Sequence, residues 1–440
     1  MNTGLDGARM NDMLDTLRSL SLVSTPITIV SWVCIILGLI GTALIVPSGK
    51  RLKTIAIAWG ISIGIALAVV LAIELVLKMT FDELKPIVIL AITLCGCCLL
   101  TFAASIFMHW RSLLGVAPLA LSLIGTLLLA NQAYVLYPTV HALETKADLD
   151  TATVDDLPAA LRSIPLPSWK PPRSGLRDHG VLVRHQPPAP ASGFNSRDAV
   201  VYLPPAWFSE PRPQLPVLVL MPGSPGDPEQ WFANGHADEL ADRYQRQHGG
   251  LAPIIASIDT TGSTFGNPLC TDSPEAKITT FVAEDVPIWL KKQFNAAPDQ
   301  HTWTLGGMSY GGTCALQTIL NRPEAYGTFL DFSGEISPND GLSHQSTVSR
   351  YFDGSQELFD ERNPESILTR SPHPDLVGHF VAGKDDDQPM EDLKKLNELA
   401  QRAGANTTFT IVDGGHDFEA WRQALEHSFS LVISRGGLPT

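Results

Sequence analysis

Four long apolar segments in the first 137 residues constrain this chain more than any other feature. They span residues 27–47, 54–77, 86–108 and 113–137. A helix rises 1.5 Å per residue, so about 20 apolar residues cross a hydrocarbon core of about 30 Å. We therefore predict four transmembrane helices. A cleaved signal peptide fits poorly, because further spans follow the first and no clear small-residue cleavage site is evident.

The loops between these segments indicate their orientation. The first and third connections are basic and carry Lys50, Arg51, Lys53 and Arg111. The second connection is balanced in charge, with Lys78, Lys85, Asp82 and Glu83. Because cytoplasmic loops are enriched in lysine and arginine, we expect the first and third loops in the cytoplasm. Both ends of the four-helix region, and the domain that follows it, are then extracytoplasmic at the cell membrane.

Polar and sulfur-containing residues within the spans do not indicate a transport pathway or a metal centre. Cys34, Cys95, Cys97 and Cys98 are interpreted as small apolar residues, because their spacing matches no metal-ligand pattern. Glu74 and Lys78, one helical turn apart, are expected to form an interfacial pair. A proton or ion pathway would need more intramembrane charge than this. We expect no metal and no cofactor.

The charge of the chain restricts its partners. The 31 basic and 45 acidic residues give a net formal charge of −14. The 8 basic and 6 acidic residues of positions 1–140 leave 23 basic and 39 acidic residues after them, a net charge of −16. Such an acidic domain argues against nucleic acid as a partner and against docking on anionic lipid by net charge. A solubilising surface is the simplest explanation.

A proline-rich segment separates the membrane region, residues 1–137, from the rest of the chain. Its prolines are Pro138, Pro158, Pro165, Pro167, Pro171 and Pro172. We predict an extended, semi-rigid linker over residues 138–178, with a short helix at 157–162. Residues 179–440 then suit one α/β domain.

Alternation of strand and helix patterns in residues 179–440 predicts a mostly parallel central sheet. Edge strands are expected at 181–185 and 199–203, and further strands near 215, 253, 302, 328, 378 and 408. Helices are expected near 228–247, 274–294, 312–321, 389–403 and 417–428. The irregular stretch 337–366 is long enough to cap a site, although it could equally be surface decoration.

The pentapeptide Gly307-Met308-Ser309-Tyr310-Gly311 marks Ser309 as the candidate nucleophile. It lies between an apolar run that ends at Leu305 and a helix-compatible stretch, which is the context that a nucleophile elbow requires. A serine hydroxyl is a weak nucleophile at neutral pH, so it needs a nearby base and backbone amides. The alternative is a glycine-rich loop in which the serine only caps the next helix.

An acid and then a histidine should follow the nucleophile along the chain, each after a late strand. The strand at 379–382 runs into Asp385, Asp386 and Asp387, any one of which could orient a base. The strand at 408–412 ends in Gly414-Gly415-His416, the best context among the twelve histidines. His416 is therefore the candidate general base. A solvated acidic turn remains the alternative for each individual aspartate.

The turn Pro222–Gly226 is a candidate site for the oxyanion. It follows the nearly continuous apolar run 215–221, which is typical of a strand buried on both faces of a parallel sheet. We expect the backbone N–H groups of Ser224 and Tyr310 to be the donors, since Pro225 has none. A tight surface loop is the alternative.

Five stretches of the second half resemble the esterase family that includes esterase D and the mycolyltransferases of actinobacterial envelopes. They are RDAVVYLPP at 197–205, VLVLMPGSPG at 217–226, LGGMSYGGTCA at 305–315, FSGE at 332–335 and GGHDFEAW at 414–421. The resemblance covers residues 197–430 and implies an α/β-hydrolase fold with serine acyl chemistry. It assigns triad roles to Ser309, His416 and Asp386, with Asp385 as the alternative acid. Three consecutive aspartates depart from the family pattern, and the family's substrate-contacting residues do not align here.

Two cysteines lie outside the membrane region. Cys314 is expected in the helix after Ser309, and Cys270 in the long loop 260–273. In an oxidising exterior they could form a disulfide that braces the elbow helix against this loop. The alternative is two buried free thiols.

Together these features predict a membrane-anchored serine esterase or acyltransferase. Its substrates would be esters, with envelope lipids or acylated sugars as candidates, and its other partner the lipid bilayer. Two alternatives remain from the sequence. The chain could be a catalytically inactive hydrolase-fold binding or assembly protein of the envelope, or its four helices could themselves handle lipid or bind a partner.

Overall fold

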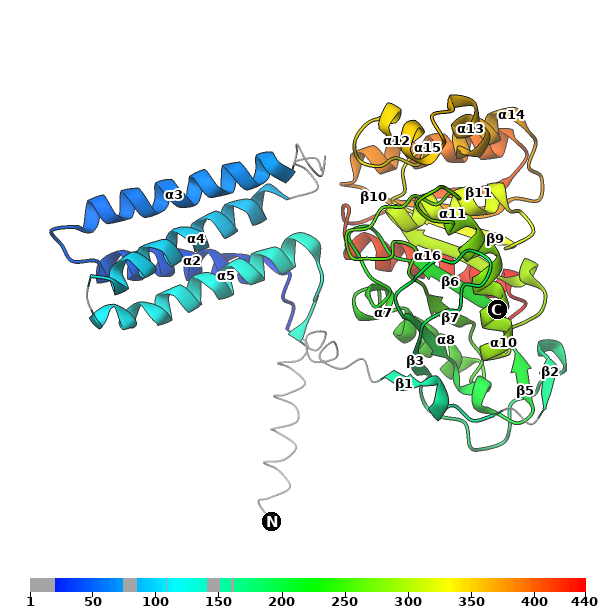
Figure 1. Ribbon diagram of the computed structural model, residues 1–440. Helices are drawn as coiled ribbons and strands as arrows, with labels where there is room; N and C mark the ends of the chain where they lie inside the picture. Colours follow the sequence, from blue (N-terminus) through cyan, green and yellow to red (C-terminus); the bar gives the residue numbers. More distant parts are fainter. Residues whose placement is uncertain (1–19, 74–84, 109, 141–150, 160–161) are drawn as a thin grey trace, which may run out of the picture. The chain divides into compact units, whose positions relative to one another are not determined.

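A computed structural model describes residues 20–73, 85–108, 110–140, 151–159 and 162–440 of the chain. It forms two compact units, Met1–Asp148 and Leu149–Thr440, which we describe separately (Figure 1). The pair expected between Glu74 and Lys78 lies outside the described residues.

The described residues of the first unit form four long apolar helices, as the sequence predicts. They are α2 (Thr25–Ile45), α3 (Arg51–Ala72), α4 (Pro86–Ile106) and α5 (Val116–Tyr134), with the 3₁₀ helix η2 (Trp110–Gly115) before α5. Each of the four is long and apolar enough to cross a membrane, the last one counted from Leu113. Large apolar side chains cover the outside of the unit, which is the arrangement that lipid favours.

Small residues allow α2 and α5 to pack closely. A Cβ atom at Gly38 would lie 2.6 Å from Ser122 Cβ, and one at Gly125 would lie 2.5 Å from the carbonyl oxygen of Ser31. Buried hydroxyls in this interior donate to carbonyls of their own helix, as Ser31 does to Ile27 O at 2.7 Å. Close backbone approach through glycine and serine is typical of helix packing in membranes.

The two ends of the first unit meet. Ser21 and Thr139 form an antiparallel bridge. The amide of Leu22 donates to Pro138 O at 2.8 Å, and that of Val140 donates to Leu20 O at 3.1 Å. The residues before α2 and those after α5 therefore lie side by side at one end of the four-helix bundle.

The second unit is built on a nine-stranded sheet with the order β1-β3-β4-β7-β6-β8-β9-β10-β11. Its strands are β1 (Thr151–Thr153), β3 (Val181–His185), β4 (Ala199–Leu203), β6 (Val217–Met221), β7 (Ile254–Ser257), β8 (Thr304–Met308), β9 (Thr328–Phe332), β10 (Val377–Gly383) and β11 (Asn406–Val412). The strands from β7 to β11 are all parallel, whereas β4 is antiparallel to both of its neighbours. The predicted mostly parallel sheet is confirmed.

Helices lie on both sides of this sheet (Figure 1). They are α7 (Gln230–Ala233), α8 (Ala237–Gln247), α9 (Ile278–Thr280), α10 (Val286–Phe294), α11 (Tyr310–Asn321), α12 (His344–Tyr351), α13 (Gln356–Arg362), α14 (Pro364–Arg370), α15 (Asp387–Arg402) and α16 (Phe418–Arg435). Helix α11 packs on β8 and β9, and α16 packs on β8, β9 and β10. The central strand β6 is buried at every residue, which explains its continuous apolar sequence.

The segment before the domain differs from the extended spacer that the prolines suggest. Its strand β1 pairs in parallel with β3, and β2 (Ser163–Pro165) pairs with β5 (Arg212–Gln214) in a second, two-stranded sheet. The expectation that β3 and β4 are edge strands is therefore wrong, because β1 takes the edge and β4 lies between β3 and β7. The prediction of a short helix at 157–162 is also wrong for its described residues, because 157–159 are not helical. A 3₁₀ turn, Val154–Asp156, lies just before them.

The stretch 337–366, expected to be irregular, instead forms the three short helices α12, α13 and α14. Each begins at a polar cap: the side chains of Ser343, Ser355 and Asn363 accept hydrogen bonds from Ser346 N, Leu358 N and Glu365 N. Such capping residues satisfy amides that the first helical turn leaves free. The sequence carried these signals, but the helices are too short for periodicity to reveal them.

Candidate active site

Ser309 lies at a sharp turn between β8 and α11. Its backbone has φ 55° and ψ −123°, a conformation that is strained for a residue with a Cβ atom. The turn is held by the Ser309 amide, which donates to Phe332 O at 2.7 Å. Two glycines make it sterically feasible: a Cβ atom at Gly307 would lie 2.4 Å from the Gly311 backbone, and one at Gly311 would lie 2.3 Å from Met221 O.

His416 and Asp386 meet Ser309 at the carboxyl ends of the parallel strands. The Nε2 atom of His416 lies 2.9 Å from Ser309 Oγ. Its Nδ1 atom lies 3.0 Å from Asp386 Oδ2 and 3.3 Å from Oδ1. The side chain of His416 is 35% exposed and that of Asp386 only 7%. A hydroxyl, an imidazole and a buried carboxylate thus form one continuous chain of hydrogen bonds.

The structure distinguishes Asp386 from its two neighbours. Asp385 and Asp387 are exposed, whereas Asp386 is buried and faces the imidazole. The amide of Asp385 donates to Gly414 O at 3.0 Å, which ties the acid loop to the histidine loop. A Cβ atom at Gly383 would lie 2.5 Å from the same oxygen, so glycine permits this close approach. The alternative acid, Asp385, therefore braces the loop with its backbone and not with its carboxylate.

The histidine loop is fixed by residues to which the sequence assigned no role. Asp417 caps α16, accepting hydrogen bonds from Glu419 N at 3.0 Å and Ala420 N at 3.2 Å. One turn later, the Trp421 ring packs edge-on against His416, with centroids 5.1 Å apart and planes at 85°. An aspartate directly before a helical stretch is a recognisable capping signal, but the contact with tryptophan depends on the tertiary structure.

The turn Pro222–Gly226 lies directly beside Ser309. A Cβ atom at Gly223 would be 3.4 Å from Ser309 Cβ and 3.8 Å from Ser309 Oγ. Neighbouring loop 264–266 holds the turn from outside: Gly226 N donates to Thr264 O at 2.9 Å, and Ser224 Oγ donates to Gly266 O at 2.9 Å. The residues expected to supply oxyanion donors, Ser224 and Tyr310, therefore lie on the two segments that flank the hydroxyl.

A partly buried ion pair supports this turn and was not anticipated from the sequence. The Nη2 atom of Arg197 donates to Asp259 Oδ1 at 2.8 Å, to Gly226 O at 3.0 Å and to Thr261 Oγ1 at 2.9 Å. Burial alone would raise the pKa of Asp259, but hydrogen bonds from Arg197 and from backbone amides outweigh it and lower the pKa. Asp259 stays ionised and holds Arg197 against the Gly226 carbonyl.

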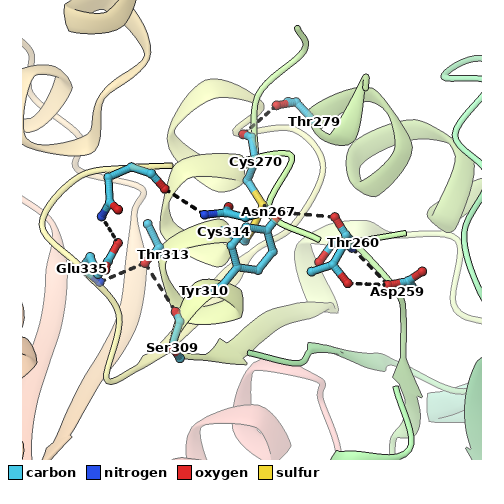
Figure 2. The surroundings of a disulfide bond; sticks show 12 residues. Asp259, Thr260, Asn267, Cys270, Thr279, Ser309, Tyr310, Thr313, Cys314 and Glu335 are labelled. Atoms are coloured by element: carbon cyan, nitrogen blue, oxygen red, sulfur yellow. Dashed lines mark hydrogen bonds between the residues drawn. A yellow bond between two sulfur atoms is a disulfide. The ribbon is translucent and has the colours of Figure 1, made fainter. Parts of the chain in front are cut away.

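Cys270 and Cys314 are joined in a disulfide with a Cα–Cα distance of 5.1 Å (Figure 2). The bond connects the loop after β7 to the second turn of α11. Nearby, Tyr310 Oη donates to Thr260 O at 3.2 Å and Thr279 Oγ1 donates to Cys270 O at 3.0 Å, so the loop is held on both sides of the bond. The elbow helix is thereby fixed to a loop that begins at the carboxyl end of β7, which is separated from β8 by β6.

The helices α12 and α13 pack on the same loop. A buried apolar cluster joins them to it, comprising Leu269, Val348, Tyr351, Phe352 and Phe359. Tyr351 Oη also donates to Asn267 O at 3.0 Å. The predicted cap region is thus attached to the disulfide-braced loop through a core of its own.

Comparison with known proteins decides the family. The family model described as "Putative esterase" matches residues 195–430, more than half of the chain. The chain belongs to this family. This esterase is 42% identical over 337 residues to an uncharacterised protein of Corynebacterium glutamicum, Cgl0967/cg1104, covering 72% of this chain and 75% of that protein. The similarity is longer than the family match and so extends beyond residues 195–430.

Solved structures agree with the fold. A ferulic acid esterase matches with a TM-score of 0.50 at 18% identity, over 58% of this chain and 98% of that one. An S-formylglutathione hydrolase from Agrobacterium tumefaciens matches with a TM-score of 0.48 at 17% identity, over 60% and 98% of the two chains. The first of these matches supports the α/β-hydrolase fold of the second unit.

Asp331 gives the esterase domain a stability that depends on pH. It is fully buried at the end of β9, and burial, with Asp392 and Glu335 nearby, raises its pKa from 3.8 to about 8 despite a hydrogen bond from Gly334 N. The unfolded chain ionises this group above about pH 4, whereas the folded chain keeps it protonated to about pH 8. The free energy of unfolding should therefore fall between these values, by several kcal/mol at about 1.4 kcal/mol per pKa unit.

The variant Asp331→Asn cannot ionise at this position, so its free energy of unfolding should lack the fall with pH that Asp331 causes. We expect the melting temperature of the variant, relative to wild type, to rise progressively from pH 5 to pH 8, measured by circular dichroism. A difference between the two proteins that stays constant over this range would contradict the burial of a neutral Asp331.

Removing the disulfide should destabilise the esterase domain. The bond closes a loop of 44 residues, for which chain entropy predicts a loss of about 4 kcal/mol in the variant with Cys270→Ser and Cys314→Ser. Chemical denaturation provides the measurement. Wild-type protein treated with a reductant is the control, and it should match the variant; reduced and oxidised wild type with equal stability would contradict the disulfide.

Proposed function

We propose that this esterase acts through an acyl-enzyme on Ser309. The observation that carries the proposal is the unbroken series of hydrogen bonds from Ser309 Oγ to His416 and from His416 to the buried Asp386. Imidazole can accept the serine proton as the hydroxyl attacks the ester carbonyl, while the carboxylate orients the ring and stabilises its cationic form. No metal is needed for these steps.

The reaction then proceeds in two stages. The Ser309 oxygen forms a bond to the carbonyl carbon, and the negative charge that develops on the carbonyl oxygen is stabilised by the N–H groups of Ser224 and Tyr310. Collapse of this intermediate breaks the ester bond, and His416 gives its proton to the departing alcohol. Water, or the hydroxyl of an acceptor, next attacks the acyl-enzyme by the same route and restores the free serine.

An exposed aromatic side chain in the loop that holds the turn next to Ser309 supports an apolar acyl group in the substrate. Phe265 is 77% exposed, although few large apolar residues of the described domain are. It lies between Thr264 and Gly266, whose carbonyl oxygens accept hydrogen bonds from the turn next to Ser309. Because exposure of phenylalanine to water is unfavourable, contact with a lipid acyl chain would compensate for it. We therefore propose acylated envelope lipids or acylated sugars as substrates.

The four apolar helices support a membrane anchor for this enzyme. The basic first loop, with Lys50, Arg51 and Lys53, favours a cytoplasmic location for that loop. The bridge between Ser21 and Thr139 is consistent with both ends of the helical unit lying on the opposite, outer side. A disulfide in the esterase domain also fits an oxidising exterior. We propose that the domain acts outside the cytoplasm.

Substitution of the nucleophile tests the mechanism. Ser309→Ala removes the attacking oxygen and should lower turnover of p-nitrophenyl esters by at least about 10⁴-fold. It should also abolish labelling by a fluorophosphonate, while expression and folding remain intact. Labelling that persists in this variant would refute the role of Ser309, and wild-type protein that is neither labelled nor active would favour an inactive binding protein.

The aspartates of the acid loop offer a matched pair of variants. Asp386→Asn should lower kcat by about 10³- to 10⁴-fold, because the amide no longer holds the imidazole in its basic tautomer. Asp385→Asn changes the same charge one residue away and should leave kcat close to that of wild type. Steady-state kinetics on a soluble ester distinguishes the two, and equal losses in both variants would contradict the assignment of Asp386.

Fusion reporters test the orientation in the membrane. Alkaline phosphatase is active only outside the cytoplasm and should be active when fused after Thr440 but inactive when fused after Gly49. Green fluorescent protein at the same two positions should give the reverse pattern. A fluorescent fusion after Thr440 with an inactive phosphatase there would place the esterase domain in the cytoplasm and overturn the proposed topology.

A further inference from the structure

A second cavity lies in the esterase unit, on a part of the fold that the catalytic arrangement does not use. It has a volume of about 300 Å³. One wall is formed by described residues of the segment before β3, and the other by Trp207, Arg212 and the end of α10; the residues of the first wall are Val154, Leu157, Pro158, Ala159 and Ser163. Its polar lining consists of Arg212, Lys291, Lys292, Gln293, Asn295 and Ser163.

Arg212 contributes a buried positive charge to this cavity. The residue is 6% exposed. Its Nε atom donates to Trp207 O at 2.8 Å, its Nη2 atom donates to Pro158 O at 2.7 Å, and its guanidinium lies 3.5 Å from the centre of the Trp207 ring. Burial lowers its pKa to about 10, partly offset by the carboxylate of Glu210, so the group remains cationic at neutral pH. Contacts with backbone carbonyls and an aromatic ring offset only part of the free-energy cost of burying this cation.

The other donors in the cavity come from the end of α10. Lys292 is exposed, and Lys291 Nζ donates to Gln300 Oε1 at 2.5 Å. Asn295 Oδ1 accepts from Ser163 Oγ at 2.8 Å, whereas its Nδ2 is buried and has no hydrogen-bond partner among the described residues. Buried amide groups are rarely left without an acceptor, and an oxygen of a ligand in the cavity would supply one for this nitrogen.

The charge of the lining is one-sided. Three residues with cationic side chains line the cavity, and none of the described residues that line it is acidic, although the chain from residue 141 onward carries a net charge of −16. A larger cavity of about 770 Å³, at the amino ends of the parallel strands, contains both signs, including Glu324, Asp375 and Arg435. Of these two cavities, the smaller one has the lining that suits a negative ligand.

Compensation of the helix dipole does not account for this cluster. Lys291 and Lys292 lie in the last turn of α10, where cations are generally favourable. Arg212, however, comes from β5, and the free Nδ2 of Asn295 is neutral. A guanidinium, two ammonium groups and an amide N–H around one small space match the oxygens of a tetrahedral anion.

We propose that this cavity binds a phosphate group. The ligand would contact Arg212, Lys291, Lys292 and the amide of Asn295, and would hold the segment that carries Pro158 and Ser163 against the rest of the domain. The link to that segment is direct, because Arg212 also binds the carbonyl of Pro158, and Asn295 binds the hydroxyl of Ser163. The phosphate could belong to an anionic lipid headgroup or to a soluble compound, and the chemistry of recognition is the same in both cases.

Hydrogen exchange of the full chain in nanodiscs tests the proposal and separates the two sources. In one arm, inorganic phosphate is added to protein in phosphatidylcholine discs. In the other, the discs contain phosphatidylglycerol and no phosphate is added. Ligand binding should slow amide exchange in a peptide covering residues 151–165. The slowing should increase with ligand concentration and reach a plateau. An effect of inorganic phosphate indicates a soluble ligand, and an effect of phosphatidylglycerol alone indicates a lipid headgroup.

Paired lysine variants provide the control. The double variant Lys291→Gln, Lys292→Gln should lower the affinity for whichever ligand slows exchange by at least about tenfold, because two charge-assisted contacts are lost. Lys277→Gln with Lys394→Gln removes the same charge from exposed positions elsewhere and should leave binding unchanged. Ester turnover should remain near wild type in both. Absence of a saturable effect in both arms, or equal weakening in the two variants, would overturn the proposal.

Discussion

The close packing around the turn at Ser309 is the constraint on which the rest of the site depends. Gly311 touches the carbonyl of Met221 so closely that a Cβ atom there would lie 2.3 Å from it. This contact fixes the first turn of α11 against the end of β6, and so brings the hydroxyl beside the turn that begins at Pro222. A strained serine backbone persists only because the neighbouring strands hold it on both sides.

Parallel strands supply the other partners without any local relation in sequence. Asp386 and His416 follow β10 and β11, and both strands end at the same edge of the sheet as β8. The contact between Asp385 N and Gly414 O then joins the two loops. The site is thus a consequence of strand order, and each of its side chains requires only a short loop to reach the others.

Several features around the site keep its loops in place. Arg197 and Asp259 hold the Gly226 carbonyl, and the bond between Cys270 and Cys314 fixes the elbow helix to the loop on which α12 and α13 pack. Among the described residues, none of these groups forms a hydrogen bond with Ser309 Oγ. They restrict the motion of the segments that do approach it, which is how a rigid scaffold preorganises a site on loops.

Sequence alone determined the apolar helices, the buried parallel strands and the glycine-flanked serine, because each follows from residue type and spacing within a short window. It left the acid unresolved among three aspartates, since only burial separates Asp386 from Asp385. It also missed β1 at the sheet edge, the capped helices after residue 343 and the cavity around Arg212. These depend on contacts between segments distant in the chain, and such contacts are decided by the packing of the whole domain.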